Sequence, residues 1–277
     1  MSFINCKGNL IDLSTPKVMG ILNITPDSFY DGGSYTSDKD ILTKTEKMLL
    51  EGATFIDVGG YSSRPGAKHI SEEEELLRVI PIIELLVKEF PEILISIDTF
   101  RSNVALQSIN TGACMVNDIS AGSMDKNMFQ TVAILQVPYI LMHMKGTPQN
   151  MQQHPTYEDV THEVIYFFSK KLAELKALGI NDLIIDVGFG FGKTMEHNYT
   201  LLKNLQLFKN LDVPILTGVS RKSMLWKLLG ITAKEALNAT TAANTIALLN
   251  GTNILRVHDV KEAMEAVKIV NQLTISY

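Results

Sequence analysis

Short apolar runs rich in Val and Ile alternate along the chain with longer segments in which apolar residues recur at helical spacing. Runs of this length and composition are typical of buried strands, and the segments between them are typical of amphipathic helices. The pattern predicts eight strands, at residues 18–23, 54–58, 94–98, 114–118, 139–143, 183–187, 214–218 and 253–257.

Strands that alternate with helices favour a parallel sheet, and eight such repeats in 277 residues match a (β/α)₈ TIM barrel, an α/β fold. A doubly wound open sheet is the alternative. The stretch before the first strand predicts a short N-terminal β-hairpin that turns at Lys7, Gly8 and Asn9 and plugs the N-terminal mouth of the barrel. Because no linker or shift in composition interrupts the pattern, we expect one domain over residues 1–277.

Several predicted helices carry their own start and stop signals. Ser71 with Glu74, and Thr232 with Glu235, have the spacing of a capping box. The run of four Glu at residues 72–75 predicts a solvated first turn, which the helix dipole favours. Glycines suited to C-terminal caps stand at Gly52, Gly112, Gly179 and Gly251.

Polar residues stand at the end of every predicted strand, where the active site of a TIM barrel lies. One Asp or Asn at such a place is typical of a turn or a helix cap, but eight polar ends out of eight are harder to explain in that way. Carboxylates gathered in a partly apolar mouth suit the N–H groups of a polar heterocycle, which predicts a small-molecule site. The polar residues are Asn23, Asp57, Asp98, Asn117, Asp118, His143, Asp186, Ser220, Arg221, Lys222, Arg256 and His258.

Cations are concentrated at the last two strands, where Arg221, Lys222, Arg256 and His258 stand. The last two loops of a TIM barrel frequently bind phosphate, helped by the N-terminus of a short extra helix. The stretch "SRKSMLWKLLG" predicts such a helix. The alternative role for Arg256 and His258 is a salt bridge to Asp259 or to the rim of the barrel.

The stretch "DLIIDVGFGFGKT" at residues 182–194 ends a buried run in an Asp that is followed by three glycines and Lys193. It is not a Walker loop, because Val187 stands where the first Gly is required, and it lacks the dinucleotide pattern G-x-G-x-x-G. Two interpretations remain, a plain glycine turn and a loop that faces a ligand.

Composition narrows the class of protein. The chain is 45% apolar and 20% charged, as is ordinary for a globular protein, and a net charge of -5 argues against binding nucleic acid or an anionic membrane surface. The sequence has no signal-peptide pattern and no run of 18 apolar residues, so we expect a cytoplasmic protein. Cys6 and Cys114 lack the spacing of a zinc site and predict free thiols.

Eight motifs follow one another between Val18 and Val267. They are "GILNITPDSFYDGG", "GATFIDVGGYSSRPGA", "ISIDTFRSNVA", "MVNDISAG", "YILMHMKGTPQNMQ", "DLIIDVGFGFGKT", "GVSRKSM" and "ILRVHDV". Taken together, they resemble the motifs of dihydropteroate synthases, transferases of folate biosynthesis in the pterin-binding TIM-barrel family and targets of sulfonamides. The resemblance implies condensation of 6-hydroxymethyl-7,8-dihydropterin pyrophosphate with p-aminobenzoate to give 7,8-dihydropteroate and pyrophosphate.

The resemblance also implies a role for each matching residue. Mg²⁺ would bridge Asn23 and the pyrophosphate, and Lys193 would lie at the periphery of the site. The implied catalytic residues are Asp98, Asp186, Lys222, Arg256 and His258. The implied pterin-binding residues are Asp98, Asn117, Met142, Asp186, Phe191 and Lys222. The implied pyrophosphate-binding residues are Asn23, Arg64, Arg256 and His258. The implied p-aminobenzoate-binding residues are Phe29, Asp31, Ser63, Pro65, Lys222 and Ser223.

Family members commonly form homodimers, and the apolar, small-residue stretch "TTAANTIALLNG" is a candidate for that contact, although a buried barrel helix has the same composition. Many members have Glu where this chain has Tyr61, and Thr where it has Ser63, so the second loop departs from the common pattern. Two rival functions are a corrinoid-linked methyltransferase that binds a methylated folate, and a pterin-binding paralogue without turnover. The methyltransferase would need a cobalamin domain, for which the sequence offers no candidate.

Overall fold

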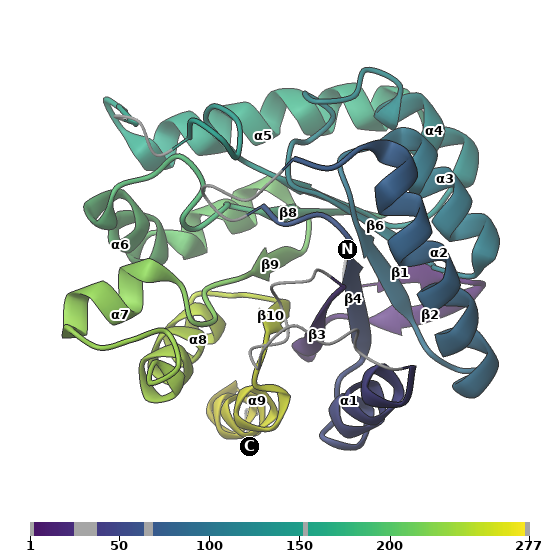
Figure 1. Cartoon of the computed structure of the whole chain (residues 1–277). Coiled ribbons are helices and arrows are strands. Elements are labelled where there is room, and N and C mark those ends of the chain that lie inside the picture. Colours follow the sequence, from purple (N-terminus) through teal and green to yellow (C-terminus); the bar gives the residue numbers. More distant parts are fainter. Residues whose placement is uncertain (1–2, 25–37, 64–68, 152–154, 275–277) are drawn as a thin grey trace.

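The computed structural model describes residues 3–24, 38–63, 69–151 and 155–274, in which eight parallel strands close into a barrel with helices around it (Figure 1). Neighbouring strands follow one another in chain order, and β10 pairs with β3 to close the ring. The closed ring confirms the TIM barrel and excludes the open sheet. The barrel strands are β3 (Lys17–Asn23), β4 (Phe55–Gly59), β5 (Ile95–Asp98), β6 (Met115–Asp118), β7 (Tyr139–Met142), β8 (Leu183–Asp186), β9 (Ile215–Thr217) and β10 (Ile254–Val257).

Helices follow the barrel strands along the chain and cover the outside of the barrel (Figure 1). The short helix expected after the seventh strand is α7, which precedes the longer α8. No described helix is long and apolar enough to cross a membrane. The helices are α1 (Asp38–Leu50), α2 (Glu72–Glu89), α3 (Ser102–Thr111), α4 (Met128–Leu135), α5 (Val160–Ala177), α6 (Met195–Lys203), the 3₁₀ helix η1 (Leu205–Leu211), α7 (Ser223–Leu229), α8 (Leu237–Leu249) and α9 (Val260–Thr274).

The strands lie where the apolar runs predict them, each within one residue of the expected range. Both faces of a barrel strand are buried, which is why its sequence is a nearly continuous apolar run. On β4, Ile56 and Val58 face outward and pack in the large core beneath the helices, whereas Phe55 faces inward and packs in the floor of the barrel. The side-chain period of two therefore separates an outer core from an inner one.

The N-terminal hairpin pairs β1 (Phe3–Cys6) with β2 (Asn9–Asp12). Lys7 and Gly8 both have positive φ, 53° and 84°, as a tight two-residue hairpin turn requires. The backbone N–H of Asn5 donates to the carboxylate of Asp182, directly before β8 (3.1 Å). The hairpin therefore lies at the N-terminal ends of the barrel strands. Its buried side chains complete the floor of the barrel, as predicted.

Both predicted cysteine thiols are free and buried, Cys6 on the hairpin and Cys114 before β6. They pack in the same cluster of apolar side chains at the floor of the barrel. The hairpin is thus part of the inner core rather than an appendage.

Two predictions about helix starts need correction. Glu235 accepts bonds from the backbone and the hydroxyl of Thr232, but these bonds close a turn, and α8 begins only at Leu237. In α2 the first turn is not wholly solvated, because the side chain of Glu75 is completely buried. The cap at Ser71, which accepts from the backbone of Glu74, is confirmed.

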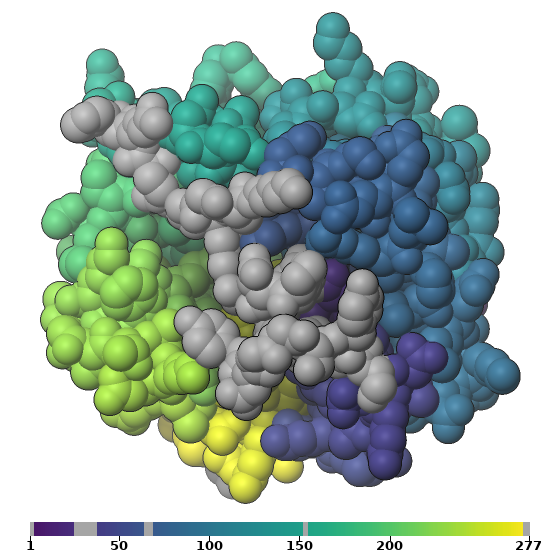
Figure 2. All heavy atoms as spheres, viewed as in Figure 1, coloured from purple at the N-terminus to yellow at the C-terminus, as the bar shows by residue number. Residues whose placement is uncertain are grey.

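Figure 2 shows the same face of the molecule with all heavy atoms. Segments from the first half of the chain, coloured purple to blue, lie along one side of this face. The segments of α6, α7 and α8, coloured green to yellow-green, lie along the opposite side. A site at the middle of the barrel therefore draws its side chains from both halves of the chain.

Candidate active site

The polar side chains at the strand ends form the layer next to the apolar floor of the barrel. Along a strand, the side chain two residues further on points to the same face. Asp57 therefore follows the floor residue Phe55, and Asp186 follows Ile184. The same step of two residues leads from the floor to Asn117, Met142 and Arg256.

Arg256 joins two carboxylates across this layer. Its Nε donates to Oδ2 of Asp57 (2.6 Å), and a terminal nitrogen donates to Oδ2 of Asp98 (2.7 Å). The amide of Asn117 donates to the same oxygen of Asp57 (3.1 Å). Side chains from β4, β5, β6 and β10 are thereby joined in one network of charge-assisted hydrogen bonds.

Asn23, at the end of β3, lies next to this network. A Cβ placed on Gly59 would lie 3.6 Å from the side-chain oxygen of Asn23 and 3.6 Å from Oδ2 of Asp98. The absent side chain of Gly59 leaves these two oxygens on either side of a small open space. The arrangement brings Asn23 together with the ion pair of Asp98 and Arg256.

Asp186 and Lys222 face each other across Gly218. A Cβ on Gly218 would lie 3.8 Å from Oδ2 of Asp186 and 3.9 Å from Nζ of Lys222. The other carboxylate oxygen of Asp186 accepts from the backbone of Gly188 (2.8 Å), and Lys222 donates to the carbonyl oxygen of Phe189. A carboxylate and an ammonium group thus lie close together at one side of the barrel mouth.

Met142 and Phe191 form an apolar wall beside these charges. Nζ of Lys222 lies 4.9 Å from the centre of the Phe191 ring. A flat ligand needs such a wall next to polar groups that hydrogen-bond to its edge. The wall consists of Tyr61, Ile70, Phe100, Ile119 and Met142, with Met124, Met144 and Phe191 packed against it.

The last two strands supply the histidine and its partner. The hydroxyl of Ser220 lies 2.9 Å from Nδ1 of His258 and accepts from the backbone N–H of His258 (3.2 Å). The salt bridge to Asp259 that we considered for Arg256 is instead made by Arg221, through two bonds of 2.9 and 2.8 Å. Arg221 is therefore occupied, and Arg256 points into the barrel.

Burial shifts the pKa of several groups in this layer. It raises the pKa of Asp98 to about 7, although Arg256 opposes the shift. It also raises the pKa of Asp186 and lowers that of Lys222 to about 8, and each of these two groups opposes the shift of the other. Burial alone would lower the pKa of Arg256, but Asp57 and Asp98 raise it, so its charge is permanent.

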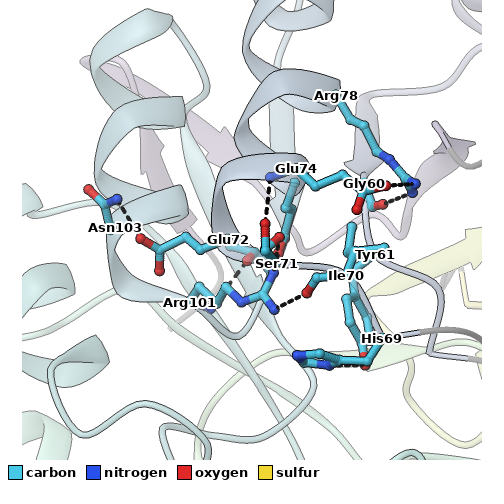
Figure 3. Close-up of polar contacts among 12 residues, drawn as sticks. Gly60, Tyr61, His69, Ile70, Ser71, Glu72, Glu74, Arg78, Arg101 and Asn103 are labelled. Atoms are coloured by element: carbon cyan, nitrogen blue, oxygen red, sulfur yellow. Dashed lines mark hydrogen bonds and ion pairs between the residues drawn. The ribbon is translucent and has the colours of Figure 1, made fainter.

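The second loop is fastened to α2 and to the start of α3 by Arg101 (Figure 3). Its guanidinium donates to the carbonyl oxygens of Ile70 (2.6 Å) and Ser71 (3.1 Å) and to Oε2 of Glu75 (2.5 Å). This ion pair explains why Glu75 is buried. Because both charges lie away from water, the pair holds the end of the loop against the barrel.

Tyr61 lies at the other end of the same loop (Figure 3). Its ring packs edge-on against Phe100 with 5.0 Å between centres, and its hydroxyl lies 3.3 Å from Nδ1 of His69. The amide of Gln149, from the loop after β7, donates to the same hydroxyl (3.0 Å). The departure from the family pattern at Tyr61 therefore links two loops through one aromatic side chain.

Several predicted residues lie outside the described part of the chain. Among the p-aminobenzoate residues, Ser63 is half-buried and follows Tyr61 by two positions, and Ser223 is exposed as the first residue of α7. The predicted residues outside the described part are Phe29, Asp31, Arg64 and Pro65.

Lys193, which the resemblance places at the periphery of the site, is buried. Sequence reasoning also gave no role to Asp57, although its position at a strand end marked it as part of the mouth. Two further residues, Glu75 and Arg101, carried no local signal, because their partners lie in other elements. All four are buried charges of the described structure.

Comparisons with known proteins agree with this geometry. A family model described as "Pterin binding enzyme" matches residues 19–258. The dihydropteroate synthase of Escherichia coli strain K12 is 46% identical over 266 residues, which are 95% of this chain and 94% of that protein.

Solved structures give the same result. Yersinia pestis dihydropteroate synthase in a complex with a sulfonamide drug is 42% identical, with a TM-score of 0.93 over 98% of this chain and 99% of that one. Xanthomonas albilineans dihydropteroate synthase in complex with 7,8-dihydropteroate is 36% identical, with a TM-score of 0.89 over 99% and 100%. With a closed barrel, a polar mouth and relatives aligned over almost its whole length, this chain belongs to the dihydropteroate synthase family of pterin-binding enzymes.

Proposed function

We propose that the mouth of this barrel condenses 6-hydroxymethyl-7,8-dihydropterin pyrophosphate with p-aminobenzoate, through the residues that the sequence places at the strand ends. The observation that carries the assignment is the joint position of Asp98, Asn117, Asp186, Lys222 and Arg256 in one layer above the barrel floor. The near-complete alignment with dihydropteroate synthases supports the same reaction.

The pterin ring would bind beside Asp186 and Lys222. The N–H groups along one edge of the ring would donate to the carboxylates of Asp186 and Asp98, and Lys222 would donate to the ring carbonyl or a ring nitrogen. Phe191 and Met142 would pack against the flat face, where a ligand with polar edges needs apolar contact. Hydrogen bonds from a charged group to a buried partner are the stronger kind, which favours this orientation.

The pyrophosphate would bind at Arg256 and His258. Arg256 uses Nε and one terminal nitrogen in its bonds to Asp57 and Asp98, and its other terminal nitrogen has no bond to a described residue. Ser220 fixes the ring of His258 through Nδ1. Arg256 is a fixed cation that stabilises the negative charge that develops on a departing pyrophosphate, and His258, whose pKa burial lowers to about 4, would bind it as a neutral hydrogen-bond donor.

A magnesium ion suits this mouth only if the substrate supplies most of its ligands. The described residues contain no group of three or more His, Cys, Asp and Glu side chains that would hold a metal ion. Mg²⁺ prefers hard oxygen ligands and is commonly held by one or two protein groups together with substrate phosphates. The side-chain oxygen of Asn23, beside Asp98, is such a group, and bound Mg²⁺ would neutralise charge on the pyrophosphate.

The proposed reaction begins with loss of pyrophosphate, which leaves a delocalised dihydropterin cation. Asp98 and Asp186 would stabilise this cation, and Arg256 and His258 would stabilise the departing anion. The neutral amine of p-aminobenzoate is already nucleophilic, so its attack requires no strong base. The new carbon–nitrogen bond forms as the amine loses one proton, and the products are 7,8-dihydropteroate and pyrophosphate.

The p-aminobenzoate pocket would lie at the second loop and the start of α7. Ser63 and Ser223 are its described members, with Lys222 between the two substrates, and the resemblance adds Phe29, Asp31 and Pro65, while it assigns Arg64 to the pyrophosphate. A carboxylate is favoured at the N-terminus of a helix, where backbone N–H groups lack partners. Sulfonamides should compete with p-aminobenzoate here.

The protein is expected to act in the cytoplasm as a homodimer. Large apolar side chains are exposed on three neighbouring helices, α7, α8 and α9, where a second copy would cover them. Of the small residues of α8 that we noted in the sequence, Ala243 and Ala247 are buried and Ala242 is exposed. The exposed apolar side chains are Leu228, Leu229, Ile246, Leu249, Ile269 and Leu273.

The deciding experiment mixes the purified protein with the dihydropterin pyrophosphate, p-aminobenzoate and Mg²⁺, and follows pyrophosphate and dihydropteroate together. Equal amounts of both products, formed only when p-aminobenzoate is present, are expected. Asp186→Asn should weaken pterin binding. Pterin binding without turnover would instead favour the non-catalytic paralogue, and methyl transfer from a methylated folate would favour the corrinoid-linked rival.

A further inference from the structure

Lys193 lies beneath the loop that connects β8 with α6, and nothing in the proposed reaction uses it. We propose that Lys193 is a positioning residue. Its ammonium group binds the backbone of this loop and thereby holds Asp186 and Phe191 in place for the pterin. The proposal rests on the assignment of the pterin pocket above.

Three backbone carbonyl groups surround the ammonium group. Nζ donates to the carbonyl oxygens of Gly188 (2.9 Å), Phe191 (3.0 Å) and His143 (3.2 Å). An ammonium group can donate three hydrogen bonds, so these carbonyls and the imidazole of His143 together offer enough acceptors for all of its N–H groups. Nζ also lies 3.0 Å from Nδ1 of His143, and Lys193 is only 3% exposed.

The imidazole of His143 takes part as a neutral acceptor. Burial, with help from Lys193 and Lys145, lowers the pKa of His143 to about 2. Burial also lowers the pKa of Lys193 to about 7, although Asp186 opposes this shift. The ammonium group is therefore costly to bury, and its carbonyl partners offset that cost.

The glycines of the loop allow this arrangement because they bring two loops into contact. A Cβ on Gly188 would collide with the carbonyl oxygen of His143, and one on Gly192 would collide with that of Lys145. Both glycines have positive φ, 70° and 62°, which an ordinary side chain rarely adopts. The loop after β8 thus lies directly on the backbone of the loop after β7, with Lys193 between them.

Each end of the loop leads from Lys193 to the pterin pocket. At one end, Gly188 accepts from Lys193 through its carbonyl oxygen and donates to Oδ1 of Asp186 through its N–H (2.8 Å). At the other end, the carbonyl of Phe191 is bound directly, and the ring of Phe191 lies under Lys222. Removal of the cation would leave the carbonyls of His143 and Phe191 without this donor, whereas that of Gly188 would keep its bond from the backbone N–H of Phe191 (3.1 Å), and the loop would hold both pocket residues less firmly.

The test is chemical rescue of Lys193→Ala. This change removes the atoms from Cγ to Nζ, which n-propylammonium reproduces, whereas 1-propanol has the same size without the charge. The dissociation constant for the dihydropterin pyrophosphate is measured by calorimetry with and without each additive. The matched control is Lys203→Met, which removes an exposed lysine from α6, the helix that follows the loop.

For Lys193→Ala we expect a loss of pterin affinity of at least about ten-fold, with restoration by n-propylammonium and not by 1-propanol. KM for p-aminobenzoate should change much less than pterin affinity, because the second substrate does not touch this loop in the proposed arrangement. If Lys193 had only a structural role, Lys193→Ala would lower stability without separating pterin affinity from KM for p-aminobenzoate. No rescue by n-propylammonium would then be seen.

Lys193→Met keeps most of the side-chain volume and removes the ammonium group. It replaces Lys193→Ala in the test if the alanine variant does not fold. Unchanged pterin affinity in folded Lys193→Met would overturn the proposal, as would equal rescue by 1-propanol. Failure of the proposed function itself is distinguishable, since the unaltered chain would then bind the dihydropterin pyrophosphate without turnover or would not bind it at all.

Discussion

The side-chain amide of Gln149 donates a hydrogen bond of 3.0 Å to the hydroxyl of Tyr61, 88 residues earlier in the chain. Tyr61 belongs to the loop after β4 and Gln149 to the loop after β7, so the bond crosses the barrel mouth. The same hydroxyl lies against His69, and the ring is buried against Phe100. One aromatic side chain therefore ties both loops to the wall of the proposed pterin site.

Tyr61→Phe should loosen this connection without disturbing the apolar wall. Because the ring remains, we expect a loss of only about 0.5–1.5 kcal/mol in the free energy of unfolding, measured by urea titration. KM for p-aminobenzoate should rise, since Ser63 follows Tyr61 by two residues. A double-mutant cycle with Gln149→Ala is the control, and strictly additive effects of the two changes would contradict a direct coupling.

Arg256→Ala should lower both activity and stability. It leaves the carboxylate of Asp57, which is completely buried, without its guanidinium partner, and breaking such a pair costs about 3–5 kcal/mol. Thermal unfolding and turnover are the two measurements. Adding Asp57→Asn should recover part of the stability and none of the activity, and an unchanged melting temperature in Arg256→Ala would refute the proposed ion pair.

The rate should depend on pH through Asp98 and Lys222. Asp98 must be ionised to accept from the pterin, so kcat/KM should fall as pH decreases through the pKa of Asp98, about 7. Lys222 must be charged to donate, so kcat/KM should fall as pH rises through its pKa of about 8. A narrow bell-shaped profile is expected from kinetics in mixed buffers. A profile that is flat across both values would show that these groups do not control the rate.

The homodimer should depend on the apolar side chains of α7, α8 and α9. Leu249→Asp places a charge among them, and we expect the molar mass measured by light scattering to fall from that of a dimer to that of a monomer. Leu77→Asp, on the exposed side of α2, is the control and should leave the mass unchanged. A monomeric mass for the unaltered chain would remove the dimer from the proposal.

Much of the barrel could be predicted from the sequence because its signals are local. Apolar runs of five or six residues marked the strands, and Lys7 and Gly8 marked the hairpin turn. The step of two residues along a strand places Asp57 and Asp186 above the floor wherever the barrel closes. Strand order and the polar strand ends were therefore sufficient to locate the mouth.

The partners of the charged side chains were decided by the tertiary structure. Arg256 was weighed as a partner of Asp259, its neighbour in sequence, but it pairs with Asp57, 199 residues away, and Arg221 takes Asp259. Glu75 lies in a run of four acidic residues that look alike in sequence, and only its position opposite Arg101 makes it the buried one.

For Lys193 as well, the sequence determined the local pattern and the tertiary structure decided the partners. The sequence determined that a lysine follows three glycines at the end of a buried strand, which is compatible with a surface turn or a ligand loop. Its burial depends on the carbonyl of His143, 50 residues earlier, coming within hydrogen-bond distance. The sequence pattern determines which face of its own strand a side chain occupies. Closure of the barrel decides which distant groups lie next to that side chain. The physical reason is that a buried charge is tolerated only where other parts of the fold supply its hydrogen-bond partners.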